Sequence, residues 1–290
     1  MPYSDRQDGV VVSAEEQRDP EEWLELGDQL ANDDPPRSLL AYQQAAEQGG
    51  YWLTYGNALS NSGKTAEAIQ AYNLALADDP AIAHRNLGIV YHDDLDDMVA
   101  AERHFRQAVE AGDGVAGRLL GEVLVDQDRP QEAIELLESA RAGGDPRALV
   151  SLGWAYKMTG HLPEAEAAFR AAHDMDLHEE TVLYLGNLLQ ELDRLDEAAD
   201  LYEQALRAGN DGVLVNLGNV RSGQGRPHEA IALYRQAIAA GDNDGWNNLG
   251  HTLQHLGHLE EAREAYTAGA ELGDTLAAAN LRALNELDHR

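Results

Sequence analysis

Residues 214–241 read LVNLGNVRSGQGRPHEAIALYRQAIAAG, and variants of this pattern recur along the chain. Its mark is a glycine inside an apolar helical run. Eight such glycines follow one another at steps of 29 to 33 residues: Gly27, Gly56, Gly88, Gly121, Gly153, Gly186, Gly218 and Gly250. A fixed period in this range predicts a solenoid in which each unit contacts only its neighbours. A helical glycine costs roughly 1 kcal/mol against alanine, so its repetition indicates that another helix passes too close for a Cβ atom.

The second half of each unit has its own signature. A small residue is followed four positions later by an aromatic or large apolar residue, and three positions after that by another small one. Instances are Ala68/Tyr72/Ala75, Ala101/Phe105/Ala108, Ala133/Leu137/Ala140, Ala165/Phe169/Ala172, Ala198/Tyr202/Ala205, Ala230/Tyr234/Ala237 and Ala262/Tyr266/Gly269. These spacings keep the three side chains on one helical face. We expect the large side chain to fill the gap between units.

Turn residues separate the helices. Four glycines lie seven positions after the helix glycine, where a left-handed C-cap ends a first helix: Gly63, Gly160, Gly225 and Gly257. A second set closes the second helices: Gly49, Gly112, Gly143, Gly209, Gly241 and Gly273. Pro130, Pro163 and Pro227 stand near the start of second helices, where a missing N–H costs little. Each unit therefore reads as helix, tight turn, helix, tight turn.

The pattern resembles the tetratricopeptide repeat, whose signature is matched by Trp52, Gly56, Ala68, Tyr72, Ala75 and Pro80. The unit departs from that family because it is shortened to about 32 residues. The helix end Ala45-Ala46-Glu47-Gln48-Gly49 looks like the related SEL-like repeat. The resemblance implies an all-α, right-handed superhelix of about eight helix pairs with a C-terminal cap helix. We expect a flexible N-terminal arm at 1–20, the repeat solenoid at 21–273 and the cap helix at 274–290.

Composition narrows the class of partner. With 21 lysines and arginines against 52 acids, the net charge is −31. That balance argues against nucleic acid and anionic membranes, and it permits a basic partner. There are no cysteines, so disulfides and thiolate metal sites are excluded. The polar residues 1–12 do not read as a secretory signal, and no apolar run reaches the length of a membrane helix. We expect a soluble, cytoplasmic protein.

Motifs for catalysis are missing from the sequence. It has no zinc-protease motif, phosphate-binding loop, nucleophile elbow or dinucleotide fingerprint after a strand. His251 and His255 have the spacing of metal ligands on one helical face, with His258 in the next turn. Two histidines without a nearby carboxylate make a weak metal site. We interpret them as groove or surface histidines, and we predict neither a catalytic residue, a metal nor a cofactor.

The resemblance implies that first helices line a concave groove with residues just before and after the helix glycine. Two of these positions carry asparagine repeatedly: Asn57, Asn86, Asn187, Asn216, Asn219, Asn248 and Asn280. A side-chain amide has both a donor and an acceptor, so stacked amides can pair with an extended peptide backbone whatever its side chains. The alternative is that asparagine only helps adjacent helices to pack.

Basic and aromatic groove positions complete the predicted site. Arg85 and Arg118 occupy the same position in successive units, and Lys157 lies further along. An arginine there could bind a partner's carboxylate bidentately, or it could pair with the chain's own acids. Trp23, Trp52 and Trp246 share a packing position, whereas Trp154 stands at a polar one. Trp154 could anchor an apolar side chain, flanked by Tyr184, or be partly buried under a neighbouring unit.

These observations predict a non-catalytic scaffold that binds a peptide or protein segment in its concave groove. The partner would be basic or would have an extended segment. The alternative is a regulatory or substrate-presenting subunit of an enzyme complex that docks through the acidic surface. Binding through surface charge should weaken steeply with ionic strength, whereas groove binding should weaken less.

Overall fold

The computed structural model describes residues 18–177 and 180–287. Within these ranges the chain is all α-helical, with seventeen α-helices and no strand. It divides into two compact units, residues 1–151 and 152–290, and the division falls within α9 (Ala148–Met158). The predicted arm at 1–20 lies outside the described residues except for its last three positions. The last three residues of the predicted cap segment, 288–290, also lie outside them.

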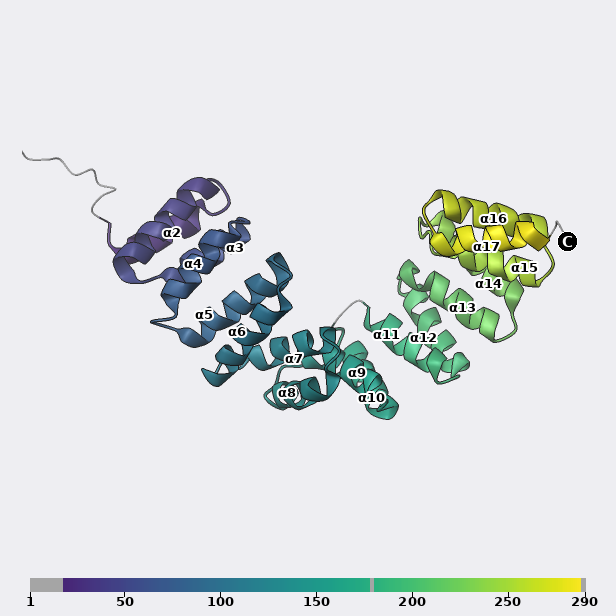
Figure 1. The fold of residues 1–290 in the computed structure, drawn as a ribbon, viewed down its shortest axis with the longest axis horizontal. Helices are drawn as coiled ribbons and strands as arrows, with labels where there is room; N and C mark the ends of the chain where they lie inside the picture. The colour runs from purple at the N-terminus through teal and green to yellow at the C-terminus, as the bar shows by residue number, and fades with distance from the viewer. Residues whose placement is uncertain (1–17, 178–179, 288–290) are drawn as a thin grey trace, which may run out of the picture. The chain divides into compact units, whose positions relative to one another are not determined.

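In the first unit, helices pack in chain order as antiparallel pairs (Figure 1). They are α1 (Pro20–Leu30), α2 (Pro35–Gly49), α3 (Trp52–Asn61), α4 (Thr65–Ala75), α5 (Pro80–Ile89), α6 (Met98–Glu110), α7 (Ala116–Asp126) and α8 (Pro130–Ala142). A short π-helical turn, η1 (Val90–Asp94), follows α5. The first helix of one pair also packs on the second helix of the pair before it, as α3 does on α2.

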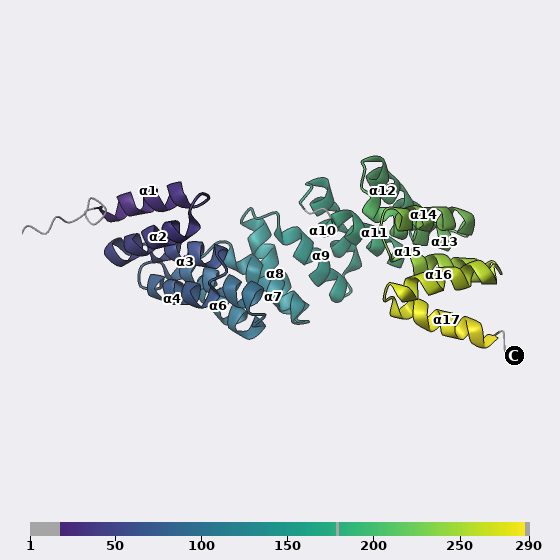
Figure 2. The same ribbon diagram turned by 90° about the horizontal axis from the view of Figure 1, so that it is seen from above.

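The second unit repeats this arrangement, and Figure 2 shows its helices from a second side. It contains α10 (Leu162–Asp174), α11 (Thr181–Glu191), α12 (Leu195–Arg207), the 3₁₀ turn η2 (Asp211–Val213), α13 (Leu214–Gly223), α14 (Pro227–Ala239), α15 (Gly245–His255), α16 (Leu259–Glu271) and α17 (Thr275–Leu287). Helix α17 lies where the sequence predicts a C-terminal cap. Its Ala277 and Leu284 are fully buried in a core cluster with Tyr266.

Another helix passes too close to each helix glycine for a Cβ atom, as predicted, and the group in contact is a large side chain of that helix. An added Cβ would lie 2.6 Å from the Tyr72 ring at Gly56 and 2.5 Å from Phe105 at Gly88. The eight pairs are Gly27/Tyr42, Gly56/Tyr72, Gly88/Phe105, Gly121/Leu137, Gly153/Phe169, Gly186/Tyr202, Gly218/Tyr234 and Gly250/Tyr266. In each pair both residues belong to one unit. The large side chain therefore covers the glycine of its own unit. It also lies between units as expected, since Tyr72 shares a core cluster with Leu87 and Val90 of the next unit.

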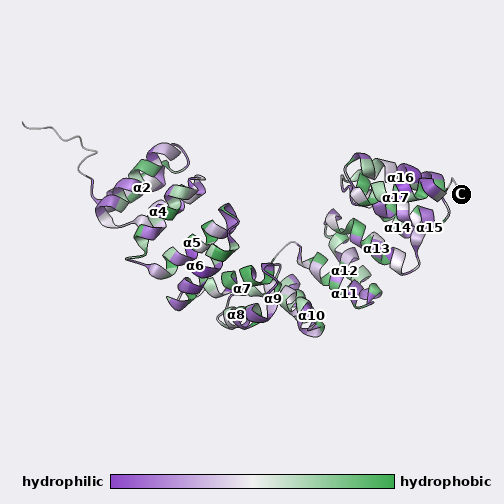
Figure 3. Cartoon of the chain, viewed as in Figure 1, coloured by the Kyte–Doolittle hydropathy of each residue, from purple (hydrophilic) through white to green (hydrophobic). Residues whose placement is uncertain are grey.

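Hydrophobic residues are distributed along all the helices rather than gathered in one centre (Figure 3). Each repeat buries its alanines and its large side chain against its neighbours, so the core is a row of small clusters. This is how a repeat array is stabilised, because no single unit can bury its apolar face alone.

The predicted turns are confirmed with one shift. Gly63, Gly160, Gly225 and Gly257 all have positive φ. In the second set, Gly112, Gly209, Gly241 and Gly273 also have positive φ. At the other two turns the left-handed residue is Gly50 or Gly144, one position after the predicted Gly49 and Gly143. Prolines begin helices as expected, for example Pro130 in α8 and Pro227 in α14. The sequence did not predict left-handed aspartates. Asp128 and Asp193 have positive φ and stand where other repeats have the turn glycine.

Candidate functional site

A tyrosine hydroxyl binds the side chain that follows the helix glycine. Tyr72 donates a hydrogen bond to Oδ1 of Asn57, at 2.8 Å between the oxygens. The same contact joins Tyr202 to Asn187 at 3.0 Å and Tyr234 to Asn219 at 2.8 Å, and Tyr42 donates to Asp28 at 2.7 Å. These asparagines are exposed on first helices, yet each has a bond that fixes its carboxamide oxygen.

Two of these oxygens accept a second hydrogen bond from the next repeat. Nδ2 of Asn86 donates to Asn57 at 2.9 Å, and Nδ2 of Asn216 donates to Asn187 at 2.9 Å. The carboxamide oxygens of Asn57 and Asn187 therefore point inward. Within the described residues the amino groups of these two side chains make no hydrogen bond, and neither do the oxygens of Asn86 and Asn216. Each pair thus presents one donor and one acceptor. We call Asn57/Asn86 and Asn187/Asn216 the amide pairs.

The remaining predicted asparagines differ. Asn280 donates to Asn247 at 2.9 Å, one residue away from the predicted Asn248. Within the described residues the Asn248 side chain makes no hydrogen bond. Position +1 of that repeat, the residue after the glycine, carries His251 instead of asparagine, and the hydroxyl of Tyr266 donates to Gln254 at 2.9 Å. The structure therefore contains the amide pairs in two places rather than one continuous ladder.

The predicted arginines are paired within the chain. Arg85 lies 2.7 Å from Asp113, whose carboxylate also accepts backbone N–H groups at the start of α7. Arg118 is only 12% exposed, and it contacts Asp145 at 2.9 Å and Glu122 at 2.5 Å. Burial would raise the pKa of Asp145, but hydrogen bonds from Arg147 and Arg118 lower it below its usual value. These contacts favour the intramolecular alternative, and contact with a partner's carboxylate stays a prediction.

Trp154 is half-buried in an aromatic cluster of the second unit. Its ring meets Phe169 and Tyr184 edge-on, with centroids 5.7 and 5.3 Å away. Nζ of Lys157 lies 5.2 Å from the Trp154 ring centroid and 2.5 Å from Glu191. The Tyr184 hydroxyl donates to Glu180, and burial together with that contact raises its pKa to about 12. Trp154 is thus packed on its neighbours, with only part of its surface left for a partner.

The histidines face each other on α15. Nε2 of His251 and Nε2 of His255 are 3.2 Å apart. Among the residues that the structure describes, no three His, Asp or Glu side chains gather as metal ligands would. The described helices include none that is both long and apolar enough to cross a membrane.

Sequence reasoning missed the tyrosine–asparagine contact, although its signal was present. Residues after the glycine are polar where the large side chain is a tyrosine, as in Asn57 with Tyr72. Where that side chain lacks a hydroxyl, the position varies: Ile89 with Phe105, Glu122 with Leu137, and Trp154 with Phe169. Matching the two positions across repeats would have predicted the bond.

Comparison with family models gives matches over most of the chain. One model described as "Tetratricopeptide repeat" matches residues 53–116, 118–176 and 215–280, and a second model with the same description matches residues 179–243. No curated protein matches the chain.

Solved structures show the same fold. The protective antigen c5321 of uropathogenic Escherichia coli, which displays an SLR fold, is 24% identical with a TM-score of 0.64 over 92% of this chain. The chain spans 64% of that antigen's length. A tetratricopeptide repeat protein of Parabacteroides merdae is 15% identical, with a TM-score of 0.57, and the match covers 87% of this chain and 98% of that one. PilF of Pseudomonas aeruginosa is 20% identical, with a TM-score of 0.54, covering 65% and 90%.

Proposed function

The chain belongs to the tetratricopeptide repeat family, and from this we propose that it is a scaffold whose amide pairs hold an extended segment of a partner protein. Repeats of this family indicate a protein–protein interaction scaffold. The finer proposal concerns how the partner is held. It rests on one observation: Asn57 and Asn187 have their oxygens fixed from inside the protein and their amino groups left on the exposed face.

An extended peptide has a C=O and an N–H in every residue. The amino group of Asn57 can donate to the peptide carbonyl, and the oxygen of Asn86 can accept from the peptide N–H. Because Tyr72 already holds the amide, little side-chain freedom is lost on binding. Contacts of this kind read the backbone and not the side chains, so specificity would come from other positions. Asn219, held by Tyr234, would extend the donors of the second unit.

The other predicted residues take smaller roles in this proposal. Arg85, Arg118 and Lys157 already contact carboxylates, so a partner's acid would have to displace Asp113, Asp145 or Glu191. Trp154 and Tyr184 would contribute the edge of a packed aromatic cluster. We propose no catalytic role, since repeat arrays of this kind are typically scaffolds.

The test uses peptides selected from a random display library on the full chain. Asn57→Asp keeps the oxygen that Tyr72 and Asn86 bind, as Asp28 does with Tyr42, and removes the donor. We expect Asn57→Asp and Asn187→Asp each to weaken binding about three- to tenfold, as loss of one hydrogen bond should. N-methylation of the peptide backbone should weaken it similarly, and alanine at most peptide positions should not.

The matched control is Asn73→Asp on the second helix α4. Asn73 is exposed, and its side chain donates a hydrogen bond to the backbone oxygen of Ile69. Asn73→Asp adds the same negative charge as Asn57→Asp, but away from the amide pairs. Equal loss of affinity in Asn73→Asp and Asn57→Asp would contradict backbone recognition.

The net charge of −31 supports a second candidate, a subunit of an enzyme complex that docks through its acidic surface. Raising the salt concentration distinguishes the two. Steep loss of affinity with salt, with Asn57→Asp and Asn187→Asp unchanged, would assign binding to surface charge.

A further inference from the structure

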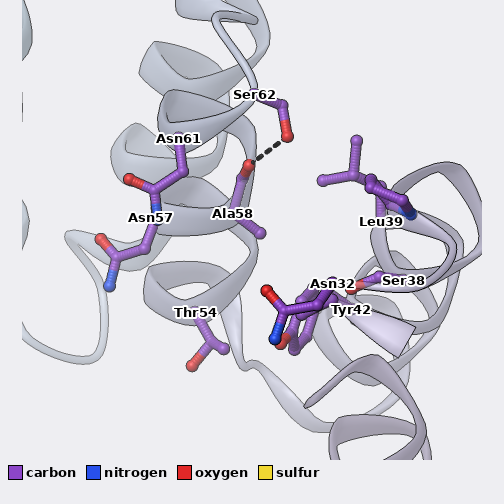
Figure 4. A pocket seen from close by; sticks show the side chains of 11 residues that line it. Asn32, Ser38, Leu39, Tyr42, Thr54, Asn57, Ala58, Asn61 and Ser62 are labelled. Carbon is purple, nitrogen blue, oxygen red and sulfur yellow. Dashed lines mark hydrogen bonds between the residues drawn. The ribbon is translucent and has the colours of Figure 1, made fainter. Parts of the chain in front are cut away.

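A hollow of about 600 Å³ opens between the first two repeats, within the first unit. It lies between the α1–α2 turn, α2 and α3, on the side of α3 that carries Thr54 and Asn57. Ala58 of α3 and Leu39 of α2 face each other across it (Figure 4). Its volume falls within the range of ligand pockets in proteins, roughly 300 to 1,000 Å³.

The hollow is lined by a small residue at a position where most other repeats bury a larger side chain. Ala58 stands two residues after the helix glycine and is half-buried. The same position carries Val90, Val123, Leu188 and Val220 in four other repeats, each at most 2% exposed, and it carries the buried Thr252 and the exposed Gln29 in two more. The alanine of α9, Ala155, is fully buried by its surroundings. The step from Gly27 to Gly56 is also the shortest of the array, so this junction packs differently from the others.

The lining is uncharged, although the chain as a whole is strongly acidic. Leu39, Pro35 and Ala58 supply apolar surface. Asn32, Thr54 and Asn61 stand at the rim, and within the described residues their side chains make no hydrogen bond. A charged group would lose water here without an opposite charge to meet it, and an aliphatic group would leave the rim without partners.

We propose that the hollow takes an aromatic side chain with a polar tip, tyrosine or tryptophan, from the extended peptide held by Asn57 and Asn86. Such a side chain places an apolar ring against Leu39 and Ala58 and a hydroxyl or indole N–H at the amide rim. Asn57 lines the hollow and belongs to the amide pair, so backbone and side chain would be read next to each other. The identity of this peptide rests on the proposed function, whereas binding of the ring itself does not.

The test measures binding of p-cresol and indole, the side-chain analogues, to the full chain by ligand-observed NMR. Ala58→Leu fills the hollow with the residue that the chain already has at Leu188. We expect saturable binding of both probes, weakened at least tenfold in Ala58→Leu, and toluene should bind more weakly than p-cresol. The unfolding temperature of Ala58→Leu should stay the same or rise. Asn73→Asp should leave probe binding unchanged.

Equal probe binding by Ala58→Leu and the unaltered chain, or no saturable binding, would overturn the proposal. Selected peptides separate it from the proposed function. If they bind Ala58→Leu as well as the unaltered chain but lose affinity with Asn57→Asp, the hollow proposal is wrong and backbone recognition stands. If the peptides bind Asn57→Asp as well as the unaltered chain while p-cresol binding is lost in Ala58→Leu, the hollow proposal stands and backbone recognition is wrong.

Discussion

At the residue scale, four of the five tyrosines that cover a helix glycine do two things, the exception being Tyr266, whose hydroxyl donates to Gln254. In these four, the ring packs on the glycine of the first helix, and the hydroxyl holds the side chain that follows that glycine, as Tyr202 does with Gly186 and Asn187. Packing and the exposed amide are thereby coupled. A phenylalanine, as at Phe105, would keep the packing and release the amide. Burial raises the pKa of Tyr202 to about 12, so its hydroxyl stays protonated and donates at any physiological pH.

The glycine positions give a sharp prediction because the chain contains its own control. Gly56→Ala would place a Cβ 2.6 Å from a carbon of the Tyr72 ring, which cannot move without disturbing Asn57. We expect a loss of about 1–3 kcal/mol in the free energy of unfolding, as overpacking costs. Gly117 is also helical, in α7, and its nearest neighbour would be 4.0 Å away. Gly117→Ala should be neutral or stabilising by up to about 1 kcal/mol.

Urea denaturation of both variants measures this difference. If Gly56→Ala is as stable as Gly117→Ala, the glycines are not required by the ring contact. The sequence indicated that another helix passes close to these glycines, but it did not identify the large side chain of the same unit as the contact. Asn57 taken alone does not reveal its hydrogen bond to Tyr72, since an exposed amide looks the same with or without an internal partner; only comparison of the two positions across repeats does.

At the element scale, the helices followed from periodicity and their turns followed from glycine. The unpredicted turns have a physical reason. Aspartate tolerates the left-handed region better than most residues, so Asp128 and Asp193 occupy it with φ of 60° and 56°. One extra residue between Gly88 and Phe105 was visible in the spacing. Its accommodation as a π-helical turn at Val90–Asp94 depends on packing that spacing does not encode.

That π-helical turn packs on a pair of histidines. Nδ1 of His84 in α5 lies 3.0 Å from Nδ1 of His104 in α6, and the His104 ring stacks on Tyr91 at 5.3 Å. Burial, together with the charge of Arg103 and the neighbouring His84, lowers the pKa of His104 to about 4. In the unfolded chain its pKa would be about 6.5. Between these values the unfolded chain binds a proton that the folded chain does not.

The free energy of unfolding should therefore fall as pH is lowered from about 6.5 to about 4, by up to about 1.4 kcal/mol per pH unit. Below about pH 4 both the folded and the unfolded chain bind this proton, so His104 causes no further change in the free energy of unfolding. His104→Phe keeps a ring against Tyr91, and we expect it to flatten the slope. His228→Phe, at an exposed position of α14, should keep it. Urea denaturation at a series of pH values checks this, and equal slopes in both variants would contradict the assignment to His104.

At the scale of the whole molecule, the acidic charge is organised by contacts between repeats. Glu102 of α6 is held by Arg106 and by Arg129 of the next repeat, 2.8 Å away. Glu166 of α10 binds Arg170 and Arg194 in the same way, and hydrogen bonds from Arg194 in particular lower its pKa. The net charge was evident from composition. Which acids are paired was not, because the partners are about 28 residues apart and meet only when repeats stack.

The last prediction follows from the packing of each helix on the helices next to it in the sequence. Helices of each unit contact mainly the next helices in the chain, so stability should be a sum of local terms. We expect Gly56→Ala to reduce amide hydrogen-exchange protection in α3 and α4 and, less strongly, in α2 and α5. Helices α13 to α16 should keep their protection. Exchange of the full chain, followed by mass spectrometry, measures both, with Gly117→Ala as the control. A uniform loss that reached α13 to α16 would mean that the chain unfolds as one cooperative body.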